Sequence, residues 1–279
     1  MQADAALLAQ GAFWAGQHAL ALFCLLLALL LATTWAGWRL LRPGALPGTQ
    51  KSPTPASPQG LRGLRAALGL ATVLLGAGFF TVLAGQLDGG LELRRADQVF
   101  ADALRVHVPP AAQPVFALLT HLADTAVLTG LCIGMAMALA ARGRAGLAVG
   151  WVVAVGGNSL LNHSLKQFFA RARPLHTDGL ALAQGFSFPS GHSSGAVVAY
   201  GTLAYLALRL LPAKWHLPAL LAAVAIAFSV GASRLFLRVH FASDVLAGFM
   251  SGAAWLALCI LGMELLRRSA RGPGTSCPP

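Results

Sequence analysis

Residues 217–266, LPALLAAVAIAFSVGASRLFLRVHFASDVLAGFMSGAAWLALCILGMELL, contain two apolar runs that are separated by a short polar turn. A membrane-spanning helix needs about 20 mostly apolar residues, and Leu217–Phe236 and Phe241–Leu266 both meet that length. Backbone groups inside hydrocarbon must be hydrogen-bonded within their own segment, so both runs are predicted to be helices. The stretch therefore predicts an all-α integral membrane protein.

The composition of the whole chain agrees with that prediction. Hydrophobic residues make up 57% of the sequence and charged residues 10%, and the mean hydropathy is +0.68. A soluble domain carries about 25% charged residues. The net charge of +11 is spread over short clusters between apolar runs, so we expect lipid contact and no nucleic-acid binding. The cysteines lack metal-ligand spacing, so no metal or cofactor is expected.

Seven segments in all are long and apolar enough to cross a membrane. Besides the two above, they are Phe13–Leu40, Leu64–Leu87, Val115–Ala141, Leu147–Phe169 and Ser193–Leu211. Residues 43–63 are rich in Pro, Gly and Ser and predict a linker. We therefore expect an extra N-terminal transmembrane helix in residues 1–42, a linker at 43–63, a six-helix transmembrane domain at 64–268 and a tail at 269–279.

Basic residues in the short loops predict the orientation, because Lys and Arg gather on the cytoplasmic side. If the helices alternate, one face collects Arg39, Arg42, Lys51, Arg62, Arg65, Arg142, Arg144, Arg209, Lys214, Arg267, Arg268 and Arg271. This face and the C-terminus are predicted to be cytoplasmic in a bacterial inner membrane. On the opposite side, residues 87–114 mix charges with apolar positions at helical spacing, which predicts a short helix on the membrane surface.

Three polar segments meet on that opposite face and carry the chemistry. They are residues 166–174 (KQFFARARP), 189–192 (PSGH) and 233–244 (SRLFLRVHFASD). Lys166, Arg173 and Arg234 supply three cations, which suit a group with more than one negative charge. Ser190 and Gly191 open a helix, whose free N–H groups favour an anion.

Two histidines and a carboxylate complete the pattern. His240 and Asp244 are spaced i, i+4 and share a helix face. An Asp that binds one ring nitrogen leaves the other nitrogen free to attack, and His192 can protonate a leaving alkoxide. Asn162, one turn before Lys166, is predicted to support the site or to join helices.

One more polar pair lies inside a predicted span and has two interpretations. His121 and Asp124 are expected to be a packed polar pair rather than a proton relay.

The pattern K-x6-R-P, P-S-G-H and S-R-x5-H-x3-D resembles the three-part motif of the type-2 phosphatidic acid phosphatase superfamily, which includes bacterial lipid pyrophosphate phosphatases. Its positions are filled by Lys166, Arg173, Pro174, Pro189, Ser190, Gly191, His192, Ser233, Arg234, His240 and Asp244. The resemblance covers residues 64–266 and implies a six-helix core with no metal ion. The N-terminal helix and the linker fall outside it.

The resemblance also implies a role for each motif residue. His240 would form a phosphohistidine, His192 would be the general acid and Asp244 would orient His240. The phosphoryl group would be bound by Lys166, Arg173, Ser190, Gly191 and Arg234, with Pro174, Pro189 and Ser233 in support. The implied activity is metal-independent hydrolysis of a phosphomonoester or pyrophosphate on a membrane lipid.

Several questions stay open at the level of sequence. Isoprenyl pyrophosphates such as undecaprenyl pyrophosphate, phosphatidate and phosphatidylglycerol phosphate all present a terminal phosphate at headgroup depth. Transfer from His240 to an acceptor lipid would make the protein a phosphotransferase, and a basic gate would suit a transporter. Soluble vanadate-dependent haloperoxidases share these residues, but the apolar helices argue against them. The oligomeric state is undetermined.

The orientation can be tested in intact cells. A Gly179→Cys variant, with the native cysteines replaced, is expected to react with a membrane-impermeant thiol reagent, because the segment between the first two polar segments is predicted to be extracytoplasmic. Labelling is measured before and after lysis. Protection until lysis would contradict the orientation.

Overall fold

The computed structural model describes residues 2–41, 58–174 and 185–269, and every regular element in these ranges is helical. The longer helices are α1 (Gln2–Gln17), α2 (Ala19–Leu41), α3 (Pro58–Gly89), α4 (Leu91–His107), α5 (Gln113–Thr120), α6 (Thr125–Ala141), α7 (Ala145–Phe169), α8 (Gly191–Leu210), α9 (His216–Phe236) and α10 (Ala242–Ser269). Three short 3-10 helices are η1 (Pro110–Ala112), η2 (His121–Ala123) and η3 (Ala213–Trp215).

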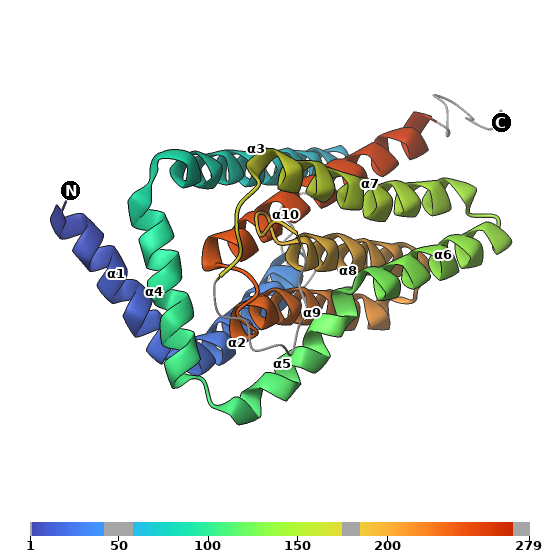
Figure 1. Cartoon of the computed structure of the whole chain (residues 1–279). Coiled ribbons are helices and arrows are strands. Elements are labelled where there is room, and N and C mark those ends of the chain that lie inside the picture. Colours follow the sequence, from blue (N-terminus) through green and yellow to red (C-terminus); the bar gives the residue numbers. More distant parts are fainter. Residues whose placement is uncertain (1, 42–57, 175–184, 270–279) are drawn as a thin grey trace, which may run out of the picture.

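Helix α8 lies at the centre of the bundle, and α7, α9 and α10 pack around it (Figure 1). Small residues allow the closest of these approaches. A Cβ atom on Gly248 would lie 2.6 Å from the carbonyl oxygen of Ser190, and one on Gly252 would lie 2.9 Å from Cα of Ser194. Glycine at these two positions brings α10 against the beginning of α8, where the PSGH segment lies.

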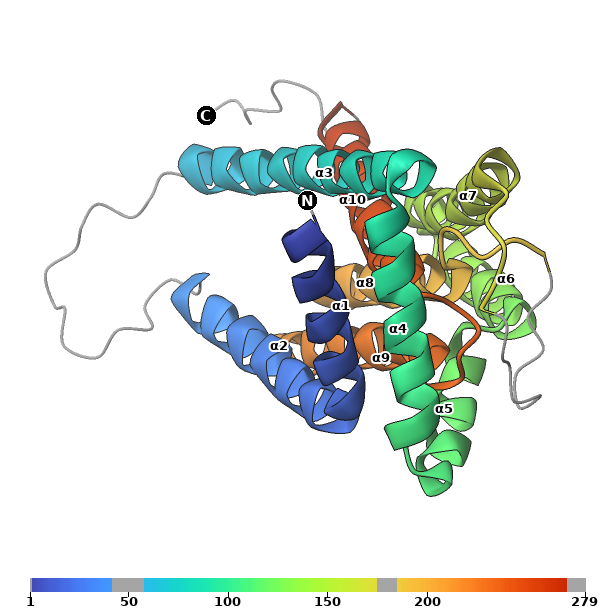
Figure 2. The ribbon, with the colours of Figure 1, turned by 60° about the vertical axis from the view of Figure 1, so that its left-hand side comes forward.

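Helix α4 runs across one end of the bundle instead of along it (Figure 2). Residues 87–114 were predicted to contain a short helix, and α4 confirms that element. Its Ala103 and Leu104 are buried, while Arg95 and Val106 are exposed. Helix α4 is therefore amphipathic, as the spacing of its apolar residues predicted.

Five described helices are long and apolar enough to cross a membrane, or six if α5 and α6 with their 3-10 turns count as one broken span. The prediction of seven spans is thus not confirmed, although a multi-pass membrane protein is. Helix α8 is not among the five or six. Its first turns carry His192, Ser193 and Ser194, which lower its hydropathy and are buried or half-buried inside the bundle.

The predicted helix Phe13–Leu40 is broken at His18, where two helices meet, and its larger part, Ala19–Leu40, is long and apolar enough to cross a membrane. Helix α2 packs along α9, with Phe23 stacked on Phe228 at 5.6 Å between ring centroids. Helix α1 turns away and packs on α4 (Figure 2). The gain of contact with α4 explains the break, which an isolated transmembrane helix would not need.

The predicted linker, residues 43–63, lies outside the described residues as far as residue 57. Helix α3 begins at Pro58, six residues before the predicted domain start at residue 64. The predicted tail lies outside the described residues from residue 270 on, as do Gly179 and its neighbours in 175–184.

The predicted continuous span Val115–Ala141 is also wrong. Helices α5 and α6 are bent by 41° at a break that contains η2. Asp124 ends this break in an extended conformation, with φ −61° and ψ 145°, immediately before α6. The break therefore turns the side chain of Asp124 out of a regular helix and toward α8.

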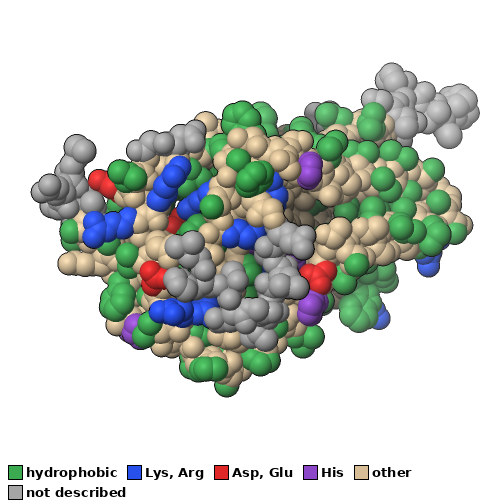
Figure 3. Space-filling model, in the orientation of Figure 1, with side chains coloured by type: hydrophobic (Ala, Val, Ile, Leu, Met, Phe, Trp, Pro, Cys, Tyr) green, Lys and Arg blue, Asp and Glu red, His purple; other side chains and the backbone are tan. Residues whose placement is uncertain are grey.

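Charged side chains are unevenly distributed along the bundle. On the face in Figure 3, most Lys, Arg, Asp and Glu side chains gather at the α4 end, and hydrophobic side chains cover α6 and α7. The turn between α6 and α7, with Arg142 and Arg144, lies at the opposite end (Figure 1). The three polar segments predicted to share one face all lie at the α4 end.

Candidate active site

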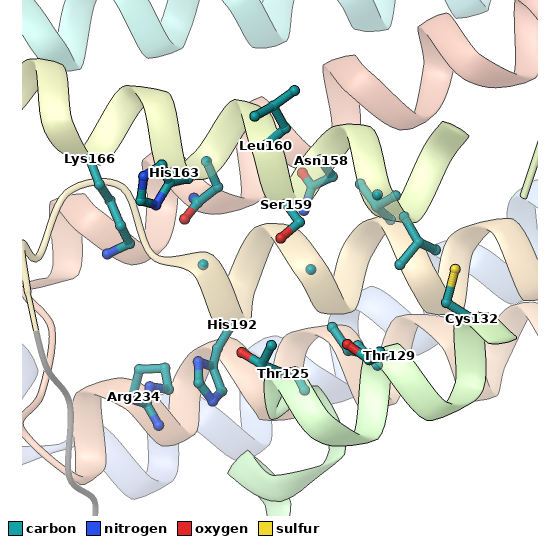
Figure 4. Close-up of a pocket in the computed structure, with 18 of the residues that line it drawn as sticks. Thr125, Thr129, Cys132, Asn158, Ser159, Leu160, His163, Lys166, His192 and Arg234 are labelled. Atoms are coloured by element: carbon teal, nitrogen blue, oxygen red, sulfur yellow. The ribbon is translucent and has the colours of Figure 1, made fainter. Parts of the chain in front are cut away.

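A pocket of about 850 Å³ opens between α6, α7 and α8, and the three polar segments meet at its polar end. Seven predicted site residues line it: Asn162, Lys166, Arg173, Gly191, His192, Arg234 and His240. In Figure 4, Lys166 comes from α7, His192 from α8 and Arg234 from α9, and the three side chains lie around the same space. Residues that are far apart in sequence thus form one cationic chamber.

Two backbone turns with positive φ deliver the side chains that do not lie on helices. Ala170, with φ +43°, ends α7 and directs the chain toward Arg173. Arg238, with φ +55°, lies in the turn between α9 and α10, two residues before His240. Left-handed backbone is unfavourable for residues with a Cβ atom. Both turns are therefore conformations that the surrounding packing must hold.

His240 is held from both sides of its ring. Nη1 of Arg173 lies 3.2 Å from Nε2, and Oδ2 of Asp244 lies 3.3 Å from Nδ1. A guanidinium group can only donate, so Nε2 accepts and the ring proton resides on Nδ1, where it is donated to Asp244. The lone pair of Nε2 therefore faces the chamber.

The environment of His240 also disfavours its charged form. The pKa of His240 lies well below its usual range because the ring is buried, and because Arg234, Arg173 and Lys166 add positive charge around it. A neutral imidazole is the nucleophilic form of histidine. The surroundings thus keep His240 in the form that can attack an electrophile.

The three predicted cations differ in the hydrogen-bond partners that hold them. Nζ of Lys166 donates to the carbonyl oxygen of Phe186 at 2.6 Å, and Arg173 also donates to the carbonyl oxygen of Phe186 at 3.1 Å. The guanidinium of Arg234 donates to Oγ1 of Thr120. Its Nε is buried and has no hydrogen-bond partner among the described residues. A buried N–H donor that lacks an acceptor lowers the stability of the fold, unless a bound ligand supplies the acceptor.

The beginning of α8 is arranged differently from the prediction at one residue. Ser190 does not line the pocket, because its fully buried side chain caps α8 and accepts hydrogen bonds from N and Oγ of Ser193. Gly191 and His192 follow in the first turn, where backbone N–H groups have no partner within the helix. In this segment the pocket is therefore lined by Gly191 and His192, and the phosphate contact of Ser190 stays a prediction.

The supporting residues mostly join helices. Nδ2 of Asn158 and of Asn162 lie 3.4 Å and 3.3 Å from Oγ of Ser194, which ties α7 to α8. A Cβ atom on Gly191 would lie 2.9 Å from Oδ1 of Asn162, so a side chain at this position would displace the amide of Asn162. Asn162 thus positions the beginning of α8.

The remaining motif residues are buried behind the chamber. Pro174 and Pro189 are buried, and neither is among the residues that line the main pocket. Oγ of Ser233, fully buried, donates to the carbonyl oxygen of Val230 at 2.6 Å. No group of three or more His, Cys, Asp or Glu side chains in the described ranges could hold a metal ion.

Sequence reasoning missed the role of Asp124. The predicted pair with His121 is present, with 2.6 Å between Oδ2 and Nδ1, but Oδ1 also lies 3.1 Å from Nε2 of His192. Asp124 therefore links the pocket histidine of α8 to the break before α6. A sequence signal existed in a carboxylate inside a predicted span, but its partner 68 residues away could not be inferred from spacing.

A second missed residue is Arg171, which lies between two residues of the first motif. Its Nη1 donates to Oδ1 of Asp244 at 2.6 Å, and its Nη2 donates to Oδ2 of Asp97 at 2.9 Å. Asp244 is thus bound by a cation on the side opposite to His240.

Apolar helices, and a pocket whose polar end carries three cations together with His192 and His240, define a multi-pass membrane protein suited to a phosphorylated lipid. A model described as the PAP2 superfamily matches residues 145–268. Phosphatidylglycerophosphatase B of Bacillus subtilis (strain 168) is 34% identical over 178 residues, which cover 62% of this chain and 86% of the relative. The chain belongs to the PAP2 superfamily and is a lipid phosphatase.

A solved structure agrees with the fold. It is described as the crystal structure of the first transmembrane PAP2 type phosphatidylglycerolphosphate phosphatase from Bacillus subtilis. The TM-score is 0.66 and the identity 30%, over 71% of this chain and 98% of the other. The family predicted from the three motifs and the membrane setting predicted from the apolar segments are therefore confirmed, and a non-enzymatic transporter is not supported.

The protonation state of His240 can be measured directly. At pH 5.5 an imidazole with an ordinary pKa of about 6.5 is about nine-tenths protonated. Because the folded protein lowers this pKa, the proton binds only at lower pH, and the ¹⁵N signals of ligand-free protein should report a neutral ring protonated at Nδ1. The signals are assigned by comparison with His240→Gln. A titration near pH 6.5 would contradict the burial argument.

Asp124→Asn is expected to slow lipid phosphate hydrolysis, because His192 loses the carboxylate that orients it. General acid catalysis contributes about 10²–10⁴-fold to a rate. Because Asp124→Asn leaves His192 in place, we expect hydrolysis to slow by only part of this factor, up to about 10²-fold. His121→Gln is the matched control, since His121 contacts the other oxygen of Asp124 on the exposed side. Equal losses in both variants would assign Asp124 a purely local structural role.

Proposed function

We propose that this protein hydrolyses the terminal phosphomonoester of a membrane lipid of the phosphatidylglycerol phosphate type through a phosphohistidine at His240. The observation that carries the proposal is the geometry of the His240 ring. Its Nδ1 proton is donated to Asp244, and its Nε2 lone pair faces a chamber that contains Lys166, Arg173 and Arg234.

The reaction has two steps, and the chamber supports both. In the first, Nε2 of His240 attacks phosphorus, the ester P–O bond breaks and His192 donates a proton to the leaving alkoxide. In the second, a water molecule loses a proton to His192 and attacks the phosphohistidine, which releases inorganic phosphate. Asp244 stabilises the positive charge that the ring of His240 carries between the two steps.

The cations favour the transition state over the free substrate. Charge develops on the phosphoryl oxygens during transfer, and fixed donors in a buried site stabilise it without reorganising. Arg234 is fully suited to this role, because its buried Nε lacks a partner among the described residues. The first-turn N–H groups of Gly191 and His192 add donors with the favourable end of the α8 dipole.

The far end of the pocket supports a lipid substrate. Away from the cations the pocket is lined by Leu128, Ile133, Val155, Leu160 and Val198. Ile133 and Leu160 are 54% and 69% exposed on α6 and α7, so this apolar arm reaches the surface that faces the membrane. In Figure 4 the arm extends from His192 past Thr125 and Thr129 toward Cys132.

The class of lipid is proposed from the relatives. The curated relative is named as a phosphatidylglycerophosphatase, and the solved structure is described as a phosphatidylglycerolphosphate phosphatase. A phosphomonoester carries up to two negative charges, which the three cations of the chamber can offset. The names of the two relatives therefore favour phosphatidylglycerol phosphate over phosphatidate and isoprenyl pyrophosphate as the substrate.

We also place the chamber on the extracytoplasmic side of the membrane. Arg142, Arg144, Arg209, Lys214 and Arg267 lie at the opposite end of the bundle, and clusters of this kind stay in the cytoplasm. The C-terminal end of α10 lies with them, which supports a cytoplasmic C-terminus.

Phosphate release by purified protein in detergent tests the proposed activity. The panel contains phosphatidylglycerol phosphate, phosphatidate and undecaprenyl pyrophosphate, each with EDTA present and without an acceptor lipid. We expect phosphatidylglycerol phosphate to be hydrolysed fastest. His240→Ala should reduce release to background, because the covalent step is lost.

Two further measurements in the same assay separate the outcomes. Rapid quenching with ³²P-labelled lipid should trap an acid-labile phosphoprotein in the parent and none in His240→Ala. Phosphate released at the parent rate by a folded His240→Ala variant would refute the mechanism. A trapped phosphoprotein that discharges only when an acceptor lipid is added would instead indicate a phosphotransferase.

A further inference from the structure

A buried polar network lies behind His240, on the side away from the pocket. The guanidinium of Arg171 donates to Asp244 at 2.6 Å and to Asp97 of α4 at 2.9 Å. Asp97 is 3% exposed and Asp244 is fully buried. One cation from the α7–α8 connection is thus shared by two buried carboxylates, one beside His240 and one on the helix that crosses the end of the bundle.

Asp97 also holds the first turn of α10. Its Oδ1 accepts a hydrogen bond from the backbone N–H of Ser243 at 3.1 Å, and its Oδ2 accepts one from Oγ of Ser243. This N–H belongs to a helix start, where no partner exists within the helix. Asp97 therefore caps α10 from another helix. The residue that it binds, Ser243, is adjacent in sequence to Asp244.

Contacts on both carboxylate oxygens fix the orientation of Asp244. Its Oδ2 accepts from the backbone N–H of Phe241 at 2.9 Å and contacts His240, and its Oδ1 is bound by Arg171. Arg171 is itself placed over the ring of Phe241, 4.3 Å from its centroid. The groups that orient Asp244 thus include the turn before α10 and Arg171, which Asp97 holds.

We propose that Asp97 and Arg171 are positioning residues, which act on the reaction through Asp244 and hold His240 in the Nδ1–H tautomer. This inference rests on the proposed roles of His240 and Asp244. Neither Asp97 nor Arg171 lines the pocket, so neither contacts the substrate.

Electrostatics explain why both residues are needed. Without Arg171, Oδ1 of Asp244 would lose the cationic donor that binds it at 2.6 Å in a buried site. Without Asp97, Arg171 would lose one of its two carboxylate partners, and its charge would fall on Asp244 alone and compete with the ring of His240 for that carboxylate. Removing one member of a buried ion pair leaves the other uncompensated, which perturbs the neighbouring geometry.

The test is a double-mutant cycle on hydrolysis of phosphatidylglycerol phosphate by the full chain. Asp97→Asn should lower kcat with little change in KM, because it acts on the nucleophile and not on lipid binding. Partners that orient functional side chains at metal sites are worth about 10- to 100-fold, and we expect a similar loss here. In an Asp244→Asn background the same substitution should have little further effect.

Two control variants lie on the same helix. Nε of Arg94 donates to the carbonyl oxygen of Leu87 at 2.8 Å, so Arg94→Gln loosens the junction of α3 and α4 without touching the network. Its effect should be the same in the parent and in the Asp244→Asn background. Asp102, whose described side-chain contact is with Gln98, is exposed, and Asp102→Asn should leave kcat unchanged.

A spectroscopic measurement covers the case in which Asp97→Asn does not fold. Arg171→Lys keeps the charge but cannot reach both carboxylates as a planar fork does. The ¹⁵N signals of His240 should then report a mixture of tautomers in place of Nδ1–H alone, whereas Arg94→Gln should keep the parent spectrum. An unchanged spectrum in Arg171→Lys would overturn the proposal.

The outcomes also separate this proposal from the proposed function. If His240→Ala abolishes release and the effect of Asp97→Asn is equal in both backgrounds, only the positioning role is wrong. If a folded His240→Ala variant releases phosphate at the parent rate, the phosphohistidine mechanism itself is wrong.

Discussion

The hydrogen bonds on the two ring nitrogens of His240 are the constraint around which the site is arranged. Arg173 donates to one nitrogen and Asp244 accepts from the other, so the ring has one tautomer and one direction. Each partner is in turn held by groups from elsewhere in the chain. Arg173 is anchored on the carbonyl oxygens of Gly185, Phe186 and Val239, and Asp244 is bound by Arg171. A small displacement of any of these groups would therefore move Nε2 of His240, the nucleophilic nitrogen.

The bundle provides that precision by packing backbones closely where the site begins. Glycines 248 and 252 of α10 bring it against the first turn of α8, and Asn162 of α7 lies on Gly191 from the other side. Because hydrophobic association between helices is weak in lipid, small residues and polar contacts such as those of Asn158 and Asn162 supply the specificity of packing. The same contacts that hold the helices together therefore define the chamber.

Local backbone strain lies in the connections that follow α7 and α9. The positive φ angles of Ala170 and Arg238 each cost energy that an unconstrained chain would avoid. Both residues stand next to groups of the chamber, and both turns are pinned by buried contacts. The rigid helices thus hold two strained connections at the places where side chains must point in unusual directions.

Much of the molecule could be predicted without coordinates. The apolar runs predicted the membrane helices because a span requires a minimum length in hydrocarbon, and the three motifs predicted which side chains would gather at one end. The errors occurred where tertiary contact outweighed local pattern. The helix 13–40 breaks at His18 because α1 packs on α4, and the segment 115–141 bends because Asp124 leaves the helix to meet His192.

Sequence alone determined the all-helical membrane class, the family and the residues of the chamber, because hydrophobic length and motif spacing are local properties that the chain carries with it. Only the tertiary structure decided how those residues are oriented. The buried position of Ser190, the link from Asp124 to His192 and the sharing of Arg171 between Asp97 and Asp244 join residues as much as 74 positions apart. Such contacts arise from the packing of helices against one another, and no periodicity within a single segment records them.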